Sequence, residues 1–118
     1  MKVLIVEDDP NRGRIWRSHI ARLGAFVDVV TAQSDAVHAL GDGSYDIVVL
    51  NLDLGCGSAM AVADYASYRR PACKVIFVTA KSFFSDGSIF SYMSNACALI
   101  PAAMPPEDMA ALVEHHGR

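Results

Sequence analysis

Residues 3–10 have the sequence Val-Leu-Ile-Val-Glu-Asp-Asp-Pro. A run of apolar residues without polar alternation is typical of a strand that is buried on both faces. The acids follow at once, and Pro10 then begins a pattern of apolar residues with helical spacing. We therefore predict a strand over Lys2–Val6, an acidic loop, and a helix that starts at Pro10 and is closed by Gly24.

The rest of the chain repeats this alternation of apolar strands and helices. Further strands are predicted over Phe26–Val30, Asp46–Leu52, Lys74–Thr79 and Cys97–Ile100. Further helices are predicted after a cap at Ser34 or Asp35 up to Gly41, over Ser58–Arg69, over Ser85–Ser94, and from Pro106 onward. Strict alternation of this kind favours an α/β fold, in which a parallel sheet is covered by helices on both faces.

Composition narrows the functional classes. The 118 residues suit one domain over 1–118, and 53% hydrophobic with 19% charged residues favours a packed core. A net charge of −3 disfavours direct nucleic-acid binding, and no apolar run approaches the roughly 18 residues of a membrane span. Three cysteines without a CxxC pair indicate free thiols, so we expect a cytoplasmic protein.

The candidate functional residues follow the strands, because sites in such sheets lie at the carboxyl ends of the strands. These ends carry Glu7-Asp8-Asp9, Asn51-Leu52-Asp53, Thr79 and Pro101-Ala102-Ala103. Clustered acids either hold a divalent cation or lie in solvated loops and cap helices. Spacing alone leaves both interpretations open.

Three motifs, at 3–10, 45–52 and 75–80, together resemble a response-regulator receiver domain over essentially the whole chain. The resemblance implies a five-stranded parallel sheet flanked by five helices, the flavodoxin-like (βα)5 fold with strand order 2-1-3-4-5. It also implies an activity in two-component signalling. Such domains take a phosphoryl group from a histidine kinase onto an aspartate, with Mg²⁺, and then bind a different partner.

Several positions depart from the pattern of this family. The phosphoacceptor position falls on Asn51, the lysine on Ala102 and the switch aromatic on Leu99, whereas the hydroxyl residue is retained as Thr79. A neutral amide oxygen does not form a stable acyl phosphate, and loss of the lysine removes the cation that would pair with a phosphoryl group. We therefore predict a degenerate phosphorylation site.

This prediction defines a phosphorylation-independent pseudo-receiver that is not an enzyme and requires no cofactor. It would act by protein–protein recognition, with a histidine kinase, an output protein or a second copy as partner. Its partner face is predicted at Phe90, Met93, Met104 and Met109, because the last helices form the output face of the resembled family. Four arginines of the first helix, among them Arg12, are interpreted as a solvated face.

Two alternatives remain. The first is an atypical phosphoacceptor with a weak Mg²⁺ site at Glu7, Asp8 and Asp53. Asp53 would contribute its carboxylate if the third strand continues that far, or otherwise its backbone carbonyl. The second is a small-ligand sensor that uses a pocket vacated beside Asn51, Thr79 and Ala102. We also predict a trans peptide bond between Ala102 and Ala103, because no proline lowers the cost of the cis form there.

Overall fold

A computed structural model describes residues 1–55, 57–80 and 95–117. Its strands are β1 (Lys2–Val6), β2 (Phe26–Val30), β3 (Ile47–Asn51), β4 (Lys74–Thr79) and β5 (Ala96–Pro101). Its helices are α1 (Pro10–Ala21), α2 (Gln33–Asp42), α3 (Ala59–Arg69) and α4 (Pro106–His116). All strand pairs are parallel, in the order β2-β1-β3-β4-β5, so the predicted α/β fold and strand order are confirmed. The helix predicted over Ser85–Ser94 lies outside the described residues.

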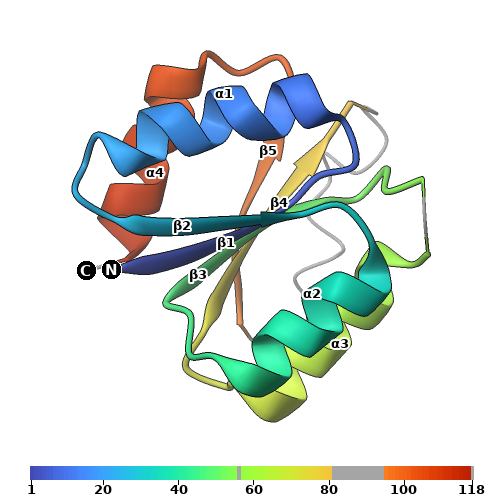
Figure 1. The fold of residues 1–118 in the computed structure, drawn as a ribbon. Coiled ribbons are helices and arrows are strands. Elements are labelled where there is room, and N and C mark those ends of the chain that lie inside the picture. The colour runs from blue at the N-terminus through green and yellow to red at the C-terminus, as the bar shows by residue number, and fades with distance from the viewer. Residues whose placement is uncertain (56, 81–94, 118) are drawn as a thin grey trace.

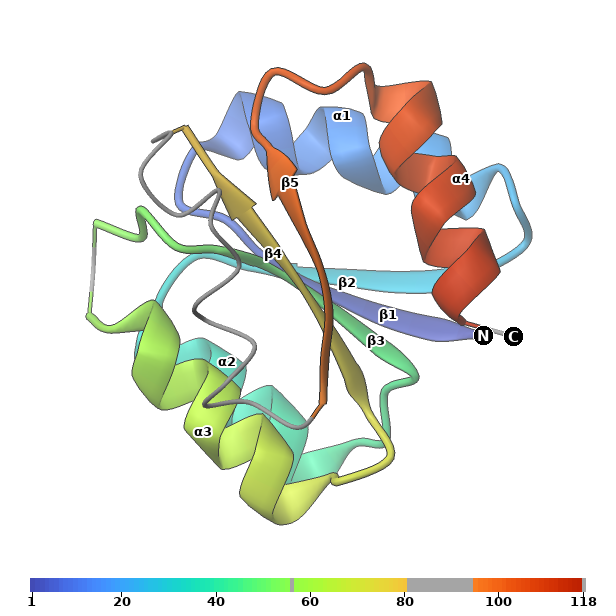
Figure 2. The ribbon, with the colours of Figure 1, turned by 180° about the vertical axis from the view of Figure 1, so that it is seen from behind.

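The sheet lies between two helical layers (Figures 1 and 2). Helices α1 and α4 cover one face, and α2 and α3 cover the other. Successive residues of β1 alternate between the layers: Leu4 and Val6 pack on the α2–α3 side, whereas Val3 and Ile5 pack on the α1–α4 side. Unbroken apolar strands therefore supply two apolar clusters, as the sequence pattern predicts.

Helix α1 begins where its sequence indicates. The Asp9 carboxylate accepts hydrogen bonds from the backbone N–H groups of Asn11 (2.9 Å) and Arg12 (3.4 Å), and Pro10 occupies the first turn. The helix ends at Ala21, and Gly24 adopts a φ of 85°, which leads the chain into β2. This geometry places Arg12 beside the carboxyl end of β1.

Helix α2 differs from its prediction at both ends. Its N-cap is Ala32, without a side-chain cap, so the predicted cap at Ser34 or Asp35 is wrong. Instead the neighbouring Gln33 side chain accepts a hydrogen bond from the Ser58 N–H at 2.8 Å, which links α2 to the start of α3. Gly41 also does not stop the helix, which continues to Asp42 and packs on α3.

Strand β3 ends at Asn51, and Asp53 lies in the turn that follows. The condition for Asp53 to share the strand face of Asn51 is therefore not met. No cis peptide bond occurs among the described residues, so the predicted trans bond between Ala102 and Ala103 is confirmed. None of the helices in this part of the chain is long and apolar enough to cross a membrane.

Candidate functional site

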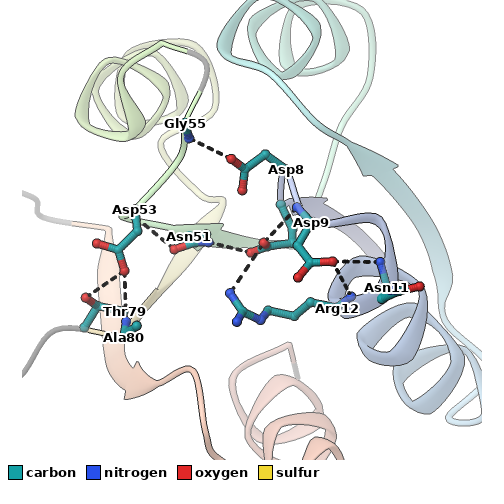
Figure 3. Close-up of polar contacts among 10 residues, drawn as sticks. Asp8, Asp9, Asn11, Arg12, Asn51, Asp53, Gly55, Thr79 and Ala80 are labelled. Atoms are coloured by element: carbon teal, nitrogen blue, oxygen red, sulfur yellow. Dashed lines mark hydrogen bonds and ion pairs between the residues drawn. The ribbon is translucent and has the colours of Figure 1, made fainter.

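The carboxyl ends of β1, β3 and β4 meet at one edge of the sheet (Figure 3). They bring together three buried polar side chains, Glu7, Asn51 and Thr79, with exposed fractions of 0%, 3% and 6%. Asp53 lies beside them in the turn after β3. The prediction that the candidate residues lie together at the carboxyl ends of the strands therefore places Glu7, Asn51 and Thr79 correctly.

Glu7 and Asn51 form the centre of this edge. The Asn51 Nδ2 donates a hydrogen bond to Glu7 Oε2 at 2.6 Å, and the Asp9 N–H donates to Glu7 Oε1 at 3.1 Å. The Arg12 Nη1 lies 3.6 Å from the same Oε1. Burial of a carboxyl group is costly unless it is hydrogen-bonded or paired, and these neighbours satisfy both of its oxygens.

The interpretation of Arg12 as part of a solvated face is wrong in part. Its side chain is 37% exposed, yet its guanidinium faces the fully buried Glu7 carboxyl group. A signal for this contact is present in the sequence: Arg12 falls in the first turn of a helix that begins soon after Glu7. The first turn of that helix must lie over the end of the first strand, where a charged side chain can reach back.

Burial raises the pKa of Glu7 above its ordinary value of 4.5. The Asp9 N–H, the Asn51 amide and the Arg12 guanidinium each oppose this shift, because they stabilise the carboxylate. The nearby Asp8 carboxylate adds a smaller upward contribution through like-charge repulsion. Desolvation is the larger effect, so the native fold favours the protonated form more than the unfolded chain does.

This shift predicts a pH dependence of stability that belongs to Glu7. A raised native pKa means that the contribution of Glu7 is fully present below the unfolded pKa and is lost as pH rises through the native pKa. We expect the Glu7→Gln variant to gain stability relative to the wild type as the pH rises above the ordinary pKa of 4.5 and through the raised native pKa. Urea denaturation of both proteins across this range measures the difference, and a difference that does not change with pH would contradict the assignment.

The three carboxylates predicted to bind Mg²⁺ have different partners. Asp8 Oδ2 accepts a hydrogen bond from the Gly55 N–H at 2.8 Å, and the Asp53 carboxylate contacts Thr79 and Ala80. In the described ranges, no group of three or more His, Cys, Asp or Glu side chains could hold a metal ion. In the described residues, Asp8 and Asp53 thus bind different backbone groups, and Glu7 is bound to Asn51 and Asp9.

Ala102 lies at the end of β5, where the resemblance places a lysine. Its N–H donates to the Thr79 carbonyl at 2.9 Å, and its side chain packs against the α1–α4 cluster. Leu99 is half-buried and packs on the α2–α3 cluster. A cavity of about 260 Å³ lies beside Ala102, lined by Arg12, Thr79, Ala80, Pro101, Ala102 and Ala103. A pocket therefore exists near Thr79 and Ala102, as predicted, but Asn51 is not in its lining.

The predicted partner face requires one correction. Met109 is fully buried in the cluster between α1, α4 and the sheet, so it is a core residue. The sequence carries the reason, because Met109 and Val113 are four residues apart and lie on the same buried face of α4. Met104 is half-buried against the same cluster. Phe90 and Met93 lie outside the described residues.

A family model described as the response regulator receiver domain matches residues 3–96. The chain belongs to this family. Receiver domains of response regulators act in two-component signalling and interact with proteins such as kinases and output domains. No curated protein sequence matches the chain.

Solved receiver structures share the fold of this domain. A CheY-like receiver domain from Methanospirillum hungatei is 20% identical, with a TM-score of 0.88, over 98% of this chain and 92% of that one. A response regulator from Thermotoga maritima, solved with Mg²⁺ and BeF, is 20% identical, with a TM-score of 0.83, over 98% and 97% of the two chains. A Burkholderia pseudomallei response regulator with a phosphorylated aspartic acid is 14% identical, with a TM-score of 0.81, over 97% and 71%. At these identities the likeness concerns the fold alone.

Proposed function

We propose that this receiver domain signals without being phosphorylated and acts by binding a protein partner. The observation that carries the proposal is the buried hydrogen bond from Asn51 Nδ2 to Glu7 Oε2. An aspartate at this position has no N–H to donate, so the bond depends on the amide. The Asn51 amide, at the position of the phosphoacceptor, is therefore a buried and hydrogen-bonded part of the site.

The side chains at the carboxyl ends of the strands support the same proposal by their chemistry. An amide oxygen is a poor nucleophile toward a phosphoryl group, because its lone pairs are delocalised toward nitrogen. Ala102 supplies only a methyl group where the family pattern has a lysine, so the developing negative charge would lack that cation. The proposed role is partner binding rather than phosphoryl transfer, so the proposal assigns no step to a metal.

Asp53 is a poor substitute for the phosphoacceptor. Its Oδ2 already accepts a hydrogen bond from the Ala80 N–H at 2.9 Å and contacts Thr79 Oγ1 at 3.3 Å. Hydrogen bonds to a carboxylate draw electron density toward the donors, so the bonded oxygen is a weaker nucleophile. These contacts argue against the atypical-acceptor alternative and favour a binding module.

The test is intact-mass spectrometry after incubation with Mg²⁺ and a small-molecule phosphodonor. We expect no phosphoryl adduct on the wild-type protein, whereas a receiver domain with an aspartate acceptor, treated in parallel, gains one. The Asp53→Asn variant is measured alongside. A wild-type adduct that disappears in this variant would identify Asp53 as the acceptor and overturn the proposal.

The cavity beside Ala102 favours a second candidate, a small-ligand sensor. Its lining includes Arg12 and Thr79 beside short alanine side chains, so a small anion is the chemistry it would take. A selective rise in the melting temperature of the wild-type protein with a small carboxylate or phosphate would support this candidate, whereas the binding-module proposal expects no such rise. Chloride at equal ionic strength controls for general salt effects.

A further inference from the structure

We propose that Asp53 is an internal anionic ligand of this receiver domain, which binds the end of β4 in place of an anion from solution. The inference deepens the proposed function, because it gives a physical means by which the site keeps one arrangement without phosphorylation. The inference depends on the direction of the Asp53 side chain. Strand β3 does not determine this direction, because β3 ends two residues before Asp53.

The first step is the contact itself. Asp53 Oδ2 accepts hydrogen bonds from the Ala80 N–H at 2.9 Å and from Thr79 Oγ1 at 3.3 Å (Figure 3). A backbone N–H and an adjacent hydroxyl that converge on one oxygen are the donors by which proteins commonly bind a carboxylate or a phosphate. Here the oxygen that they bind belongs to the protein.

The second step is how the Asp53 side chain is held. The Asp53 N–H donates to Asn51 Oδ1 at 2.9 Å, so the asparagine amide connects Glu7 on one side with the Asp53 backbone on the other. The next bond along the chain, from the Leu52 N–H to the Val78 carbonyl at 2.8 Å, holds the turn against β4. The carboxylate is thus presented to β4 by an ordered turn, at little further cost in conformational entropy.

The third step is the location of the two donors, the Ala80 N–H and the Thr79 hydroxyl. Thr79 and Ala80 also line the cavity that contains Arg12 and the alanines at the end of β5. Thr79 is buried, whereas Ala80 is exposed. If the Asp53 carboxylate is removed, the two donors remain at a solvent-accessible cavity with a guanidinium in its wall. A carboxylate from solution can then reach them.

Chemical rescue tests the inference. We expect the Asp53→Ala variant to melt roughly 4–8 °C below the wild type, because a charge-assisted contact is lost. Sodium acetate should raise the melting temperature of this variant by roughly 2–5 °C above the effect of sodium chloride, through binding to the native state. The wild-type protein should show no selective response to acetate, because its own carboxylate occupies the donors.

Two further variants sharpen the test. Asp53→Asn keeps an oxygen that can accept from Ala80 but removes the charge, so a smaller loss and little rescue are expected. Asp64→Ala removes a carboxylate from an exposed position on α3, so neither a loss nor a rescue is expected. If Asp53→Ala does not fold, the amide exchange of Ala80 in Asp53→Asn replaces the melting experiment. Faster exchange than in the wild type supports the inference.

Several outcomes would overturn the inference: an Asp53→Ala variant as stable as the wild type, acetate responses of equal size in both proteins, or unchanged Ala80 exchange in Asp53→Asn. The proposed function fails by a different readout, a phosphoryl adduct on the wild-type protein. The two failures are therefore distinguishable.

Discussion

Replacing Trp16 by alanine is expected to lower the free energy of unfolding by about 3–5 kcal/mol. Trp16 is 2% exposed and is among the largest fully buried side chains of the domain. It packs in the α1–α4 cluster with Ile20 and Val113, so its removal leaves a cavity between α1 and the sheet. The loss should also release α1, and with it the position of Arg12 one turn earlier.

Urea denaturation followed by far-ultraviolet circular dichroism measures this loss, because the chain has a single tryptophan and the variant has no tryptophan fluorescence. Tyr68→Ala is the matched control. Tyr68 is 83% exposed on α3, so its removal should change the stability by less than about 0.5 kcal/mol. Equal losses in the two variants would contradict the described packing of α1.

Restoring an aspartate at position 51 is expected to destabilise the domain. In Asn51→Asp, Glu7 Oε2 loses its 2.6 Å donor and faces a second carboxylate instead. An unsatisfied buried acceptor costs about 1–3 kcal/mol, and more when it is charged. The interpretation of Asn51 as a structural amide therefore predicts that a return to the family residue weakens the fold.

The pH dependence of this loss follows from the sign of the interaction. Two adjacent carboxylates disfavour the charged form, so the pKa of the pair rises above the unfolded values. The variant therefore loses stability relative to the wild type as pH rises through the native pKa of the pair, and the loss is smallest in acid. Measurements in a metal-free buffer with a chelator exclude stabilisation by a divalent cation.

A swapped pair provides the control. In the double variant Glu7→Gln/Asn51→Asp, the amide and the carboxylate exchange places, so a hydrogen bond between the two positions can form again. We expect the double variant to recover most of the loss, with a coupling energy of about 0.5–3 kcal/mol between the sites. An Asn51→Asp variant as stable as the wild type at neutral pH would contradict the structural role of the amide.

The fold could be predicted from sequence because its strands are apolar without interruption. Each strand lies between turn residues and a helical pattern, which indicates an α/β fold. The order of the strands in the sheet came from the family resemblance. The ends of α2 were not predictable in the same way. Gln33 bonds to the start of α3, a contact between residues far apart in the chain that local cap preferences do not contain.

The site was predictable only in part, for a related reason. Strand ends placed Glu7, Asn51 and Thr79 at one edge, since parallel strands share the direction of their carboxyl ends. The direction of Asp53 depends on the turn after β3, and no periodicity describes a turn. The overall acidity of the chain favours a solvated face for Arg12, although its place in the first turn of α1 determines its contact with Glu7.

The alternation of side chains along β1 has a consequence for how this domain can change. Leu4 and Val6 belong to one apolar cluster, and Val3 and Ile5 belong to the other. Among the described residues, the sheet therefore separates two apolar clusters that share the backbone of the same strands. We therefore expect a replacement in the α2–α3 cluster to be compensated by a second replacement within that cluster, with little effect on the α1–α4 cluster.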